Sequence, residues 1–135
     1  MPGHTGIQPQ LYADDGRSAV DFYLRAFGAT ELHRVGGTDQ DPSVVAQLAV
    51  GEHAFWVTSA EASGRVSLRS SGSFTCRLLL VTDDPPAFLA RAVDEGATLI
   101  SPVDDEHGWL VGRIHDPEGF EWEIGCPTGD WPPPA

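Results

Sequence analysis

The stretches IQPQLYADDGRSAVDFYLRAFGAT (7–30) and SFTCRLLLVTDDPPAFLARAVDEGAT (73–98) decide the fold of this chain. Each is an extended apolar segment that ends in Asp-Asp and is followed by an amphipathic helix and Gly-Ala-Thr. The Gly-Ala-Thr triplets begin at residues 28 and 96, 68 residues apart, and the Asp-Asp pairs begin at 14 and 83, 69 apart. Three matched features at nearly one offset indicate an internal repeat, with two unrelated strand–helix pairs as the alternative.

Both helices carry start and stop signals as well as an apolar stripe. In the first helix, apolar residues recur at intervals of three and four from Ala19 to Phe27, which predicts one buried face. Asp14 or Asp15 suits its N-cap, and Gly28 suits a left-handed stop. The second helix repeats these signals, with Asp83 or Asp84 as N-cap, Pro85-Pro86 in the first turn, and Gly96 as the stop.

Three strands are predicted after each helix, so each half is a βαβββ unit. The fold class is therefore α+β, with two tandem βαβββ modules. We expect a single domain over residues 1–135, with repeat one at about 7–59, a small, polar linker at 60–73, repeat two at about 74–126 and a Pro-rich tail at 127–135. The predicted strands are 30–35, 44–50 and 53–59 in the first half, and 98–103, 109–116 and 120–125 in the second.

The charge balance excludes several kinds of partner. Twenty acidic residues stand against eight basic ones, for a net charge of −12. Such a field repels nucleic acids and anionic membranes, so neither is expected as a partner. No apolar run of about 18 residues and no signal-peptide pattern occurs, which predicts a soluble, cytoplasmic protein. Cys76 and Cys126 are expected to be free, buried thiols.

Three motifs resemble the vicinal oxygen chelate superfamily, which includes glyoxalase I, bleomycin-resistance proteins and extradiol dioxygenases. They are SAVDFYLRAFGAT (18–30), GEHAFW (51–56) and RIHDPEGFEWEIG (113–125). The resemblance covers about residues 7–127 and is greatest to the PhnB-like or drug-binding branch. It implies that the curled mixed sheets of the two βαβββ modules form a cleft, within a homodimer.

Strand alternation separates the residues that face the core from those that face the cleft. The core set includes Ile7, Cys76 and Trp122, and the opposite faces supply the predicted ligand-binding residues. These are Gln8, Gln10, Tyr12, Trp56, Thr58, Arg77, Trp109, Arg113, Glu121 and Glu123.

The resemblance also assigns four positions to the metal ligands of the family's metalloenzymes: Gln8, Trp56, Arg77 and Glu123. Only Glu123 is a good ligand, because the indole nitrogen of Trp56 offers no lone pair and Arg77 is a permanent cation. We therefore expect neither a metal nor another cofactor, and an ion pair between Arg77 and Glu123 is the structural alternative to a ligand-binding role. The histidines lack a metal-binding spacing, although His107 and His115 flank the strand of Trp109.

Two tryptophans in a polar cleft favour the binding of a flat aromatic molecule. This resembles the family's antibiotic-sequestering members, which implies drug sequestration, with a role in antibiotic resistance or secondary metabolism. The competing hypothesis is a lyase or isomerase, with or without a metal, in which Glu123 is the general base and Arg77 or Arg113 stabilises an oxyanion. A third hypothesis is an interaction domain that has lost its ligand.

Overall fold

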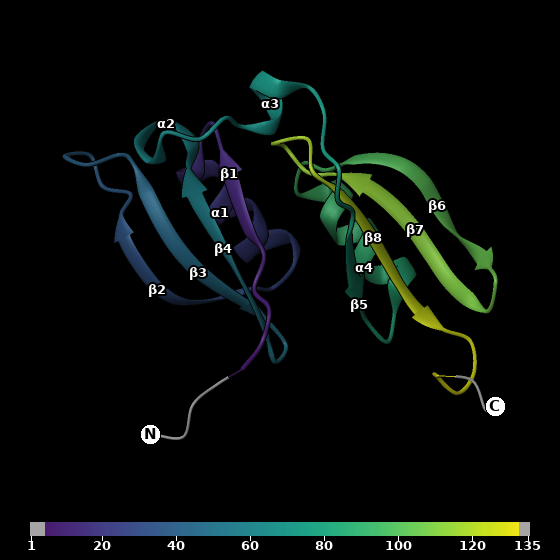
Figure 1. Cartoon of the computed structure of the whole chain (residues 1–135). Coiled ribbons are helices and arrows are strands. Elements are labelled where there is room, and N and C mark those ends of the chain that lie inside the picture. Colours follow the sequence, from purple (N-terminus) through teal and green to yellow (C-terminus); the bar gives the residue numbers. More distant parts are fainter. Residues whose placement is uncertain (1–4, 133–135) are drawn as a thin grey trace.

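The two halves of the chain fold in the same way, as the internal repeat predicts (Figure 1). The computed structural model of the protein describes residues 5–132. Repeat one contains β1 (Gln10–Ala13), α1 (Gly16–Ala26), β2 (Thr30–Gly36), β3 (Val44–Val50) and β4 (His53–Ser59). Repeat two contains β5 (Leu78–Val81), α4 (Pro85–Asp94), β6 (Thr98–Glu106), β7 (Trp109–His115) and β8 (Glu121–Pro127).

Each half forms a four-stranded mixed sheet, in the order β1-β4-β3-β2 or β5-β8-β7-β6. The first strand of each module pairs in parallel with the last, and the other pairings are antiparallel. The predicted α+β class with two tandem modules is therefore confirmed. The two sheets do not close into a barrel, and β1 and β5 are edge strands.

The helix end signals act as predicted. Asp15 caps α1 by accepting a hydrogen bond from the backbone N–H of Ser18 at 3.1 Å. Asp84 does the same for α4, accepting from the N–H of Ala87 at 3.2 Å. Gly28 and Gly96 have positive φ angles of 64° and 119°, a backbone conformation that residues with a Cβ atom rarely adopt. Local signals thus define both helices.

One aromatic core joins the two repeats. Helices α1 and α4 pack against each other and against the sheets, behind them in the view of Figure 1. Tyr23 of α1 contacts Phe55 of β4 and Trp122 of β8. Phe27, the C-cap of α1, contacts Trp122, with ring centroids 4.9 Å apart. Trp122 is buried, which confirms the prediction that it belongs to the core. Because the helices cover one face of each sheet, the opposite faces remain at least partly exposed.

Buried carboxylates link the repeats across this core. Asp116, in the turn before β8, is 4% exposed and accepts hydrogen bonds from the Tyr23 hydroxyl and from Trp122 Nε1, the latter at 2.9 Å. Glu118, 3% exposed, accepts from the backbone N–H of Asp14 at 2.7 Å. We call Tyr23, Trp122, Asp116 and Glu118 the inter-repeat clamp.

Several strand ends differ from the sequence-based expectation. Strands β1 and β5 begin at Gln10 and Leu78, where their parallel pairing with β4 and β8 begins. Ile7 is consequently 97% exposed and Cys76 is exposed, so the prediction that both face the core is wrong. Both cysteines are free, as predicted, and Cys126 is half-buried.

The connection between the repeats is more ordered than a simple linker. It contains two single-turn helices, α2 (Ala60–Ser63) and α3 (Leu68–Ser71), each of which ends at a glycine with a left-handed conformation. Strand β6 extends to Glu106, past the predicted end at residue 103, because an edge strand tolerates Pro102 and the acidic residues that follow. None of the helices within residues 5–132 is long and apolar enough to span a bilayer.

Candidate functional site

The ten predicted ligand-binding residues all remain at least partly exposed, and they fall into two groups, one on each sheet. On β4 the alternation is as predicted, since Phe55 and Val57 are buried while Trp56 and Thr58 are half-exposed. The five residues of repeat one are Gln8, Gln10, Tyr12, Trp56 and Thr58, and the five of repeat two are Arg77, Trp109, Arg113, Glu121 and Glu123.

In repeat one, an amide holds the exposed indole in place. Gln8 Oε1 accepts a hydrogen bond from Trp56 Nε1 at 2.8 Å and another from Gln47 Nε2 at 3.0 Å. Gln10 and Gln47 flank Trp56 on the neighbouring strands in register with it. The indole therefore has a fixed orientation within an amide-rich surface, as a stacking platform requires.

Tyr12 and Thr58 lie apart from this amide cluster. The Tyr12 ring lies beside Arg65, whose guanidinium carbon is 5.8 Å from the ring centroid. Thr58 lines a separate hollow of about 180 Å³ near α2. Neither residue is therefore joined to the contact between Gln8 and Trp56.

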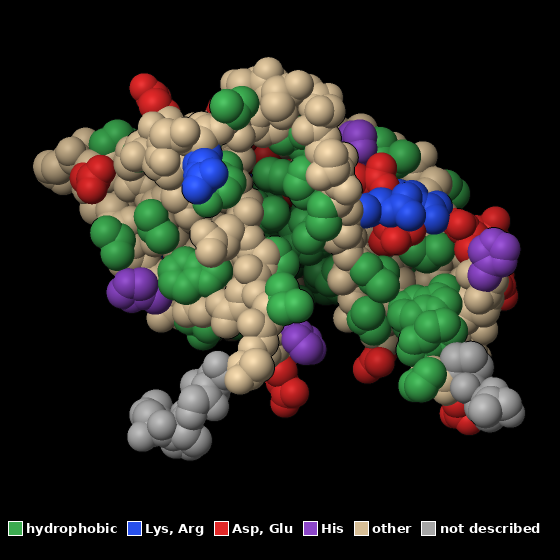
Figure 2. Space-filling view, in the orientation of Figure 1, with side chains coloured by type: hydrophobic (Ala, Val, Ile, Leu, Met, Phe, Trp, Pro, Cys, Tyr) green, Lys and Arg blue, Asp and Glu red, His purple; other side chains and the backbone are tan. Residues whose placement is uncertain are grey.

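In repeat two, acidic and basic side chains alternate across the exposed face of the sheet, visible as blue groups between red ones in Figure 2. The end members are His115, whose Nε2 lies 3.7 Å from Glu121, and Glu106, 3.0 Å from Arg113. Between them, Arg77 lies 3.2 Å from Glu121 and 3.4 Å from Glu123. We call this set the charge ladder; its members in order are His115, Glu121, Arg77, Glu123, Arg113 and Glu106.

Arg113 is the most fully engaged member of the ladder. Its Nε donates to Glu123 at 3.1 Å, and Nη1 and Nη2 donate to the two carboxylate oxygens of Glu106, both at 3.0 Å. Nη1 also reaches Ser101 Oγ at 3.5 Å, and Nη2 lies 2.9 Å from Glu123. The hydrogen bonds from Arg113 lower the pKa of Glu106, and the same contacts raise the pKa of Arg113 above its ordinary value.

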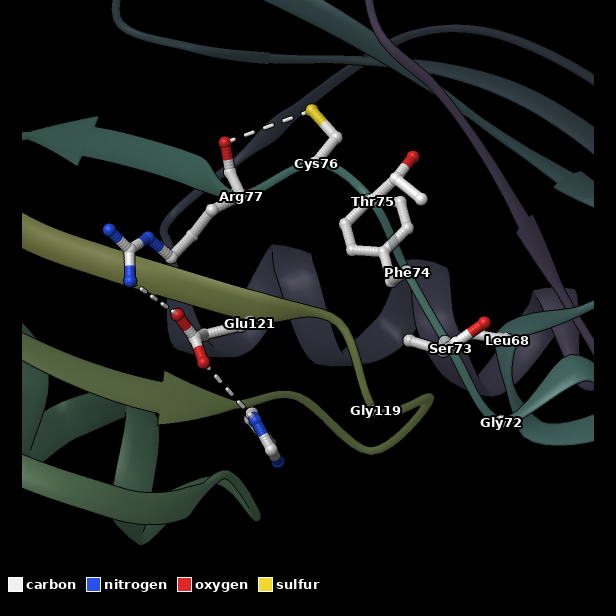
Figure 3. Close-up of a pocket in the computed structure, with 10 residues that line it drawn as sticks. Leu68, Gly72, Ser73, Phe74, Thr75, Cys76, Arg77, Gly119 and Glu121 are labelled. Atoms are coloured by element: carbon white, nitrogen blue, oxygen red, sulfur yellow. Dashed lines mark hydrogen bonds and ion pairs between the residues drawn. The ribbon is translucent and has the colours of Figure 1, made fainter.

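Two hollows adjoin the ladder. The smaller, of about 200 Å³, is lined by Trp109, Arg113, Glu123 and Leu79. The larger, of about 490 Å³, lies where the α3 segment meets β8 (Figure 3). There Arg77 points toward Glu121, and the Phe74 ring and the Cys76 thiol form the other side. The five predicted residues of repeat two are therefore divided between two hollows, Arg77 and Glu121 at the larger and Trp109, Arg113 and Glu123 at the smaller.

Trp109 does not stand alone. Its ring packs edge-on against Trp131 of the tail, with centroids 5.3 Å apart. Both the hollow and the tail thus border this indole, and a ligand that stacks on Trp109 would meet Trp131 at its edge.

An apolar groove separates the two polar faces, visible as green surface between them in Figure 2. It has a volume of about 410 Å³ and is lined by residues of both modules. Ile7 and Pro9 contribute from one side, Leu79 and Val81 from the other, and Trp122 lies at its base. The arrangement offers apolar surface flanked by two aromatic, polar surfaces.

The four positions that correspond to the family's metal ligands do not suit a metal ion. Trp56 Nε1 carries a hydrogen and donates it to Gln8, and Arg77 lies against Glu123 as a permanent cation. The predicted ion pair between Arg77 and Glu123 is thereby confirmed. Within residues 5–132, no three His, Cys, Asp or Glu side chains form a group that could hold a metal ion.

Two important residues escaped the sequence analysis. Gln47 is opposite Trp56 in the β3–β4 register, a pairing that the short Gly51-Glu52 loop could have indicated. Glu106 lies beyond the predicted end of its strand, and only the β6–β7 pairing brings it within reach of Arg113. His107 and His115, flagged as near the cleft, line the smaller and the larger hollow respectively.

Comparison with known proteins agrees with this architecture. The family model described as a glyoxalase-like domain matches residues 10–125. An uncharacterized protein of Mycobacterium bovis is 32% identical over 127 residues, which cover 90% of this chain and 83% of that protein.

Two solved structures share the fold over nearly their whole length. One, a gene product of Arabidopsis thaliana, has a TM-score of 0.68 and 27% identity, covering 92% of this chain and 98% of its own. The other, TnmS3 from Streptomyces sp. CB03234, is described as an antibiotic binding protein. It has a TM-score of 0.69 and 19% identity, and the match covers 94% of this chain and 98% of TnmS3. At 19% identity the similarity to TnmS3 concerns the fold.

Proposed function

Because the chain belongs to the glyoxalase-like domain family, within the vicinal oxygen chelate superfamily, we propose that it is a metal-independent binding protein for a small aromatic molecule. The ligand we propose is an antibiotic or another secondary metabolite, which the protein sequesters for self-resistance or as a biosynthetic accessory. This assigns the chain to the drug-binding branch of the superfamily. TnmS3, which is described as an antibiotic binding protein, provides a precedent on the same fold.

The observation that carries the proposal is the arrangement of two partly exposed tryptophans, Trp56 and Trp109. Trp56 is oriented by Gln8, and Trp109 borders a hollow beside the paired side chains of Arg113 and Glu123. An oriented indole stacks on a planar ligand with about 0.5–1.5 kcal/mol beyond the free energy of area burial. The amide and charged groups around each indole supply hydrogen bonds for the polar edge of such a ligand.

The contacts of Glu123 favour binding over catalysis. A general base needs a carboxylate oxygen that is free to reach the substrate. Here Oε1 of Glu123 lies 3.4 Å from Arg77 Nε, and Oε2 lies 2.9 Å from Arg113 Nη2. Both oxygens are thus engaged by cations, which supports a structural role for this carboxylate in an ordered binding surface.

The proposal is tested by titrating chelator-treated protein with a panel of flat aromatic antibiotics and simpler aromatic compounds while tryptophan fluorescence is recorded. Saturable quenching at micromolar concentrations is expected. Trp56→Ala and Trp109→Ala should each remove part of the quenching and weaken affinity, because each substitution removes a stacking surface. Trp131→Phe controls for quenching at the exposed tail ring, which is 58% exposed. Unchanged affinity in both Trp56→Ala and Trp109→Ala would contradict the stacking hypothesis.

We further propose that the functional form is a homodimer in which a second copy covers the apolar groove. Ile7, Leu79 and Val81 are exposed along it, and the edge strands β1 and β5 border it with unpaired backbone groups. Light scattering coupled to gel filtration measures the mass directly. A monomer at micromolar concentration would overturn the dimer. The cytoplasmic location stays a prediction.

A further inference from the structure

We propose that Glu106 is a specificity-determining residue: by occupying Arg113, it restricts the site to aromatic ligands that carry no negative charge. This inference rests on the proposed binding function and adds the charge class of the ligand. Glu106 contacts Arg113 through both carboxylate oxygens, each at 3.0 Å.

The first step is the supply of hydrogen-bond donors. A guanidinium has five N–H donors, and a ligand carboxylate is bound most strongly by two of them in parallel. In Arg113 the donors point to Glu123, Glu106 and Ser101, so Glu106 occupies the pair of parallel donors that a ligand carboxylate would need. Arg113 therefore lines the smaller hollow without offering it an anion site.

The second step is the local charge. The smaller hollow is lined by two carboxylates, Glu106 and Glu123, against one guanidinium, that of Arg113. An anionic group that entered this hollow would meet a paired cation and a surplus of negative charge. Like charges brought together across a binding surface select against the wrong ligand.

The third step is what remains available to a ligand. In the larger hollow, Arg77 is 52% exposed in its side chain, and its Nη2 makes no hydrogen bond within residues 5–132. The N–H groups of this nitrogen suit a neutral carbonyl oxygen. Glu121 Oε1, which accepts no hydrogen bond within the same residues, can accept from a ligand N–H or O–H. The site thus suits an uncharged or positively charged aromatic molecule.

The experiment compares naphthalene-2-carboxamide with naphthalene-2-carboxylate, which share one ring system and differ in charge, by isothermal titration calorimetry. The wild-type protein should bind the amide at least about tenfold more tightly than the acid. Glu106→Gln frees part of the Arg113 fork and removes a negative charge. The ratio of acid to amide affinity should therefore rise about tenfold, the scale of one hydrogen bond to a charged group.

Glu31→Gln is the matched control, because Glu31 pairs with Arg34 on the outer strand β2, 2.7 Å away, and is also a partly exposed carboxylate. This variant should leave the ratio unchanged. Equal binding of acid and amide by the wild type, or an unchanged ratio in Glu106→Gln, would overturn the inference and leave the binding function intact. If neither compound binds and no member of the antibiotic panel binds, the proposed function itself is contradicted.

Discussion

Replacing Tyr23 by phenylalanine removes one hydroxyl group from the inter-repeat clamp and changes little else. The ring is 1% exposed and packs among Phe22, Phe27, Phe55 and Trp122, so phenylalanine fills the same space. The lost contact is the hydrogen bond from the Tyr23 hydroxyl to Asp116.

A hydrogen bond to a charged group contributes about 1.5–3 kcal/mol. Asp116 keeps three other donors, from Trp122 Nε1 and from the backbone N–H groups of Glu118 and Phe120, at 2.9, 2.9 and 3.0 Å. The carboxylate is therefore not orphaned, and we expect a loss of about 2 kcal/mol in the free energy of unfolding. For a domain of this size that corresponds to a fall in Tm of roughly 7 °C.

Urea denaturation followed by far-ultraviolet circular dichroism measures the loss as a lower midpoint at an unchanged slope. Tyr12→Phe is the matched control, because Tyr12 is half-exposed on β1 and its change should stay within about 0.5 kcal/mol. A midpoint for Tyr23→Phe as close to the wild type as that of Tyr12→Phe would refute the view that the clamp holds the repeats together.

Three further perturbations test other parts of the structure. Burial raises the pKa of Asp116 above its ordinary value of 3.8. The carboxyl group of Asp116 therefore stays protonated to a higher pH in the folded protein than in the unfolded chain. The stability from this group is therefore complete below pH 3.8 and is lost as the pH rises through the raised pKa. Asp116→Asn should abolish that part of the pH dependence in urea titrations; an identical pH profile would contradict it. Gly16→Ala places a Cβ 2.4 Å from Val44 Cγ1 and should lower stability by about 1–3 kcal/mol, whereas Gly129→Ala, with open space around it, should not. Equal melting temperatures for the two alanine variants would contradict the close packing of Gly16 against Val44. Glu123→Gln should lower the free energy of unfolding by about 1 kcal/mol, because two guanidiniums lose their shared partner, and an unchanged melting curve would show that the pairs contribute nothing.

The charge ladder includes two of the four positions that correspond to the metal ligands of the family's metalloenzymes, Arg77 and Glu123. In the metalloenzymes that the chain resembles, an ion at the centre of the cleft organises the surrounding ligands. Here Arg77 lies against Glu123 near that position, and Arg113 extends the network to Glu106. Each of the two guanidiniums contacts two carboxylates, so the ion pairs order this face and leave a surplus of negative charge on it.

The features that depend on neighbours in the sequence were predictable from the sequence. Helix α1 begins after Asp15, whose side chain accepts a hydrogen bond from a backbone N–H of the first turn. It stops before Gly28, whose positive φ ends the helical conformation. The face of β4 was also predictable, since a strand with one apolar face buries Phe55 and exposes Trp56 whatever its partners are.

Only the tertiary structure decided which distant side chains meet. Ile7 and Cys76 alternate correctly for a strand, but each lies before the point where its parallel partner begins, so neither is covered. The contacts of Asp116 with Tyr23 and of Arg113 with Glu106 join elements through packing and register, which residue spacing does not encode. The repeat and its helices follow from short-range backbone chemistry, whereas the clamp and the charge ladder arise only when separate strands and helices are brought together.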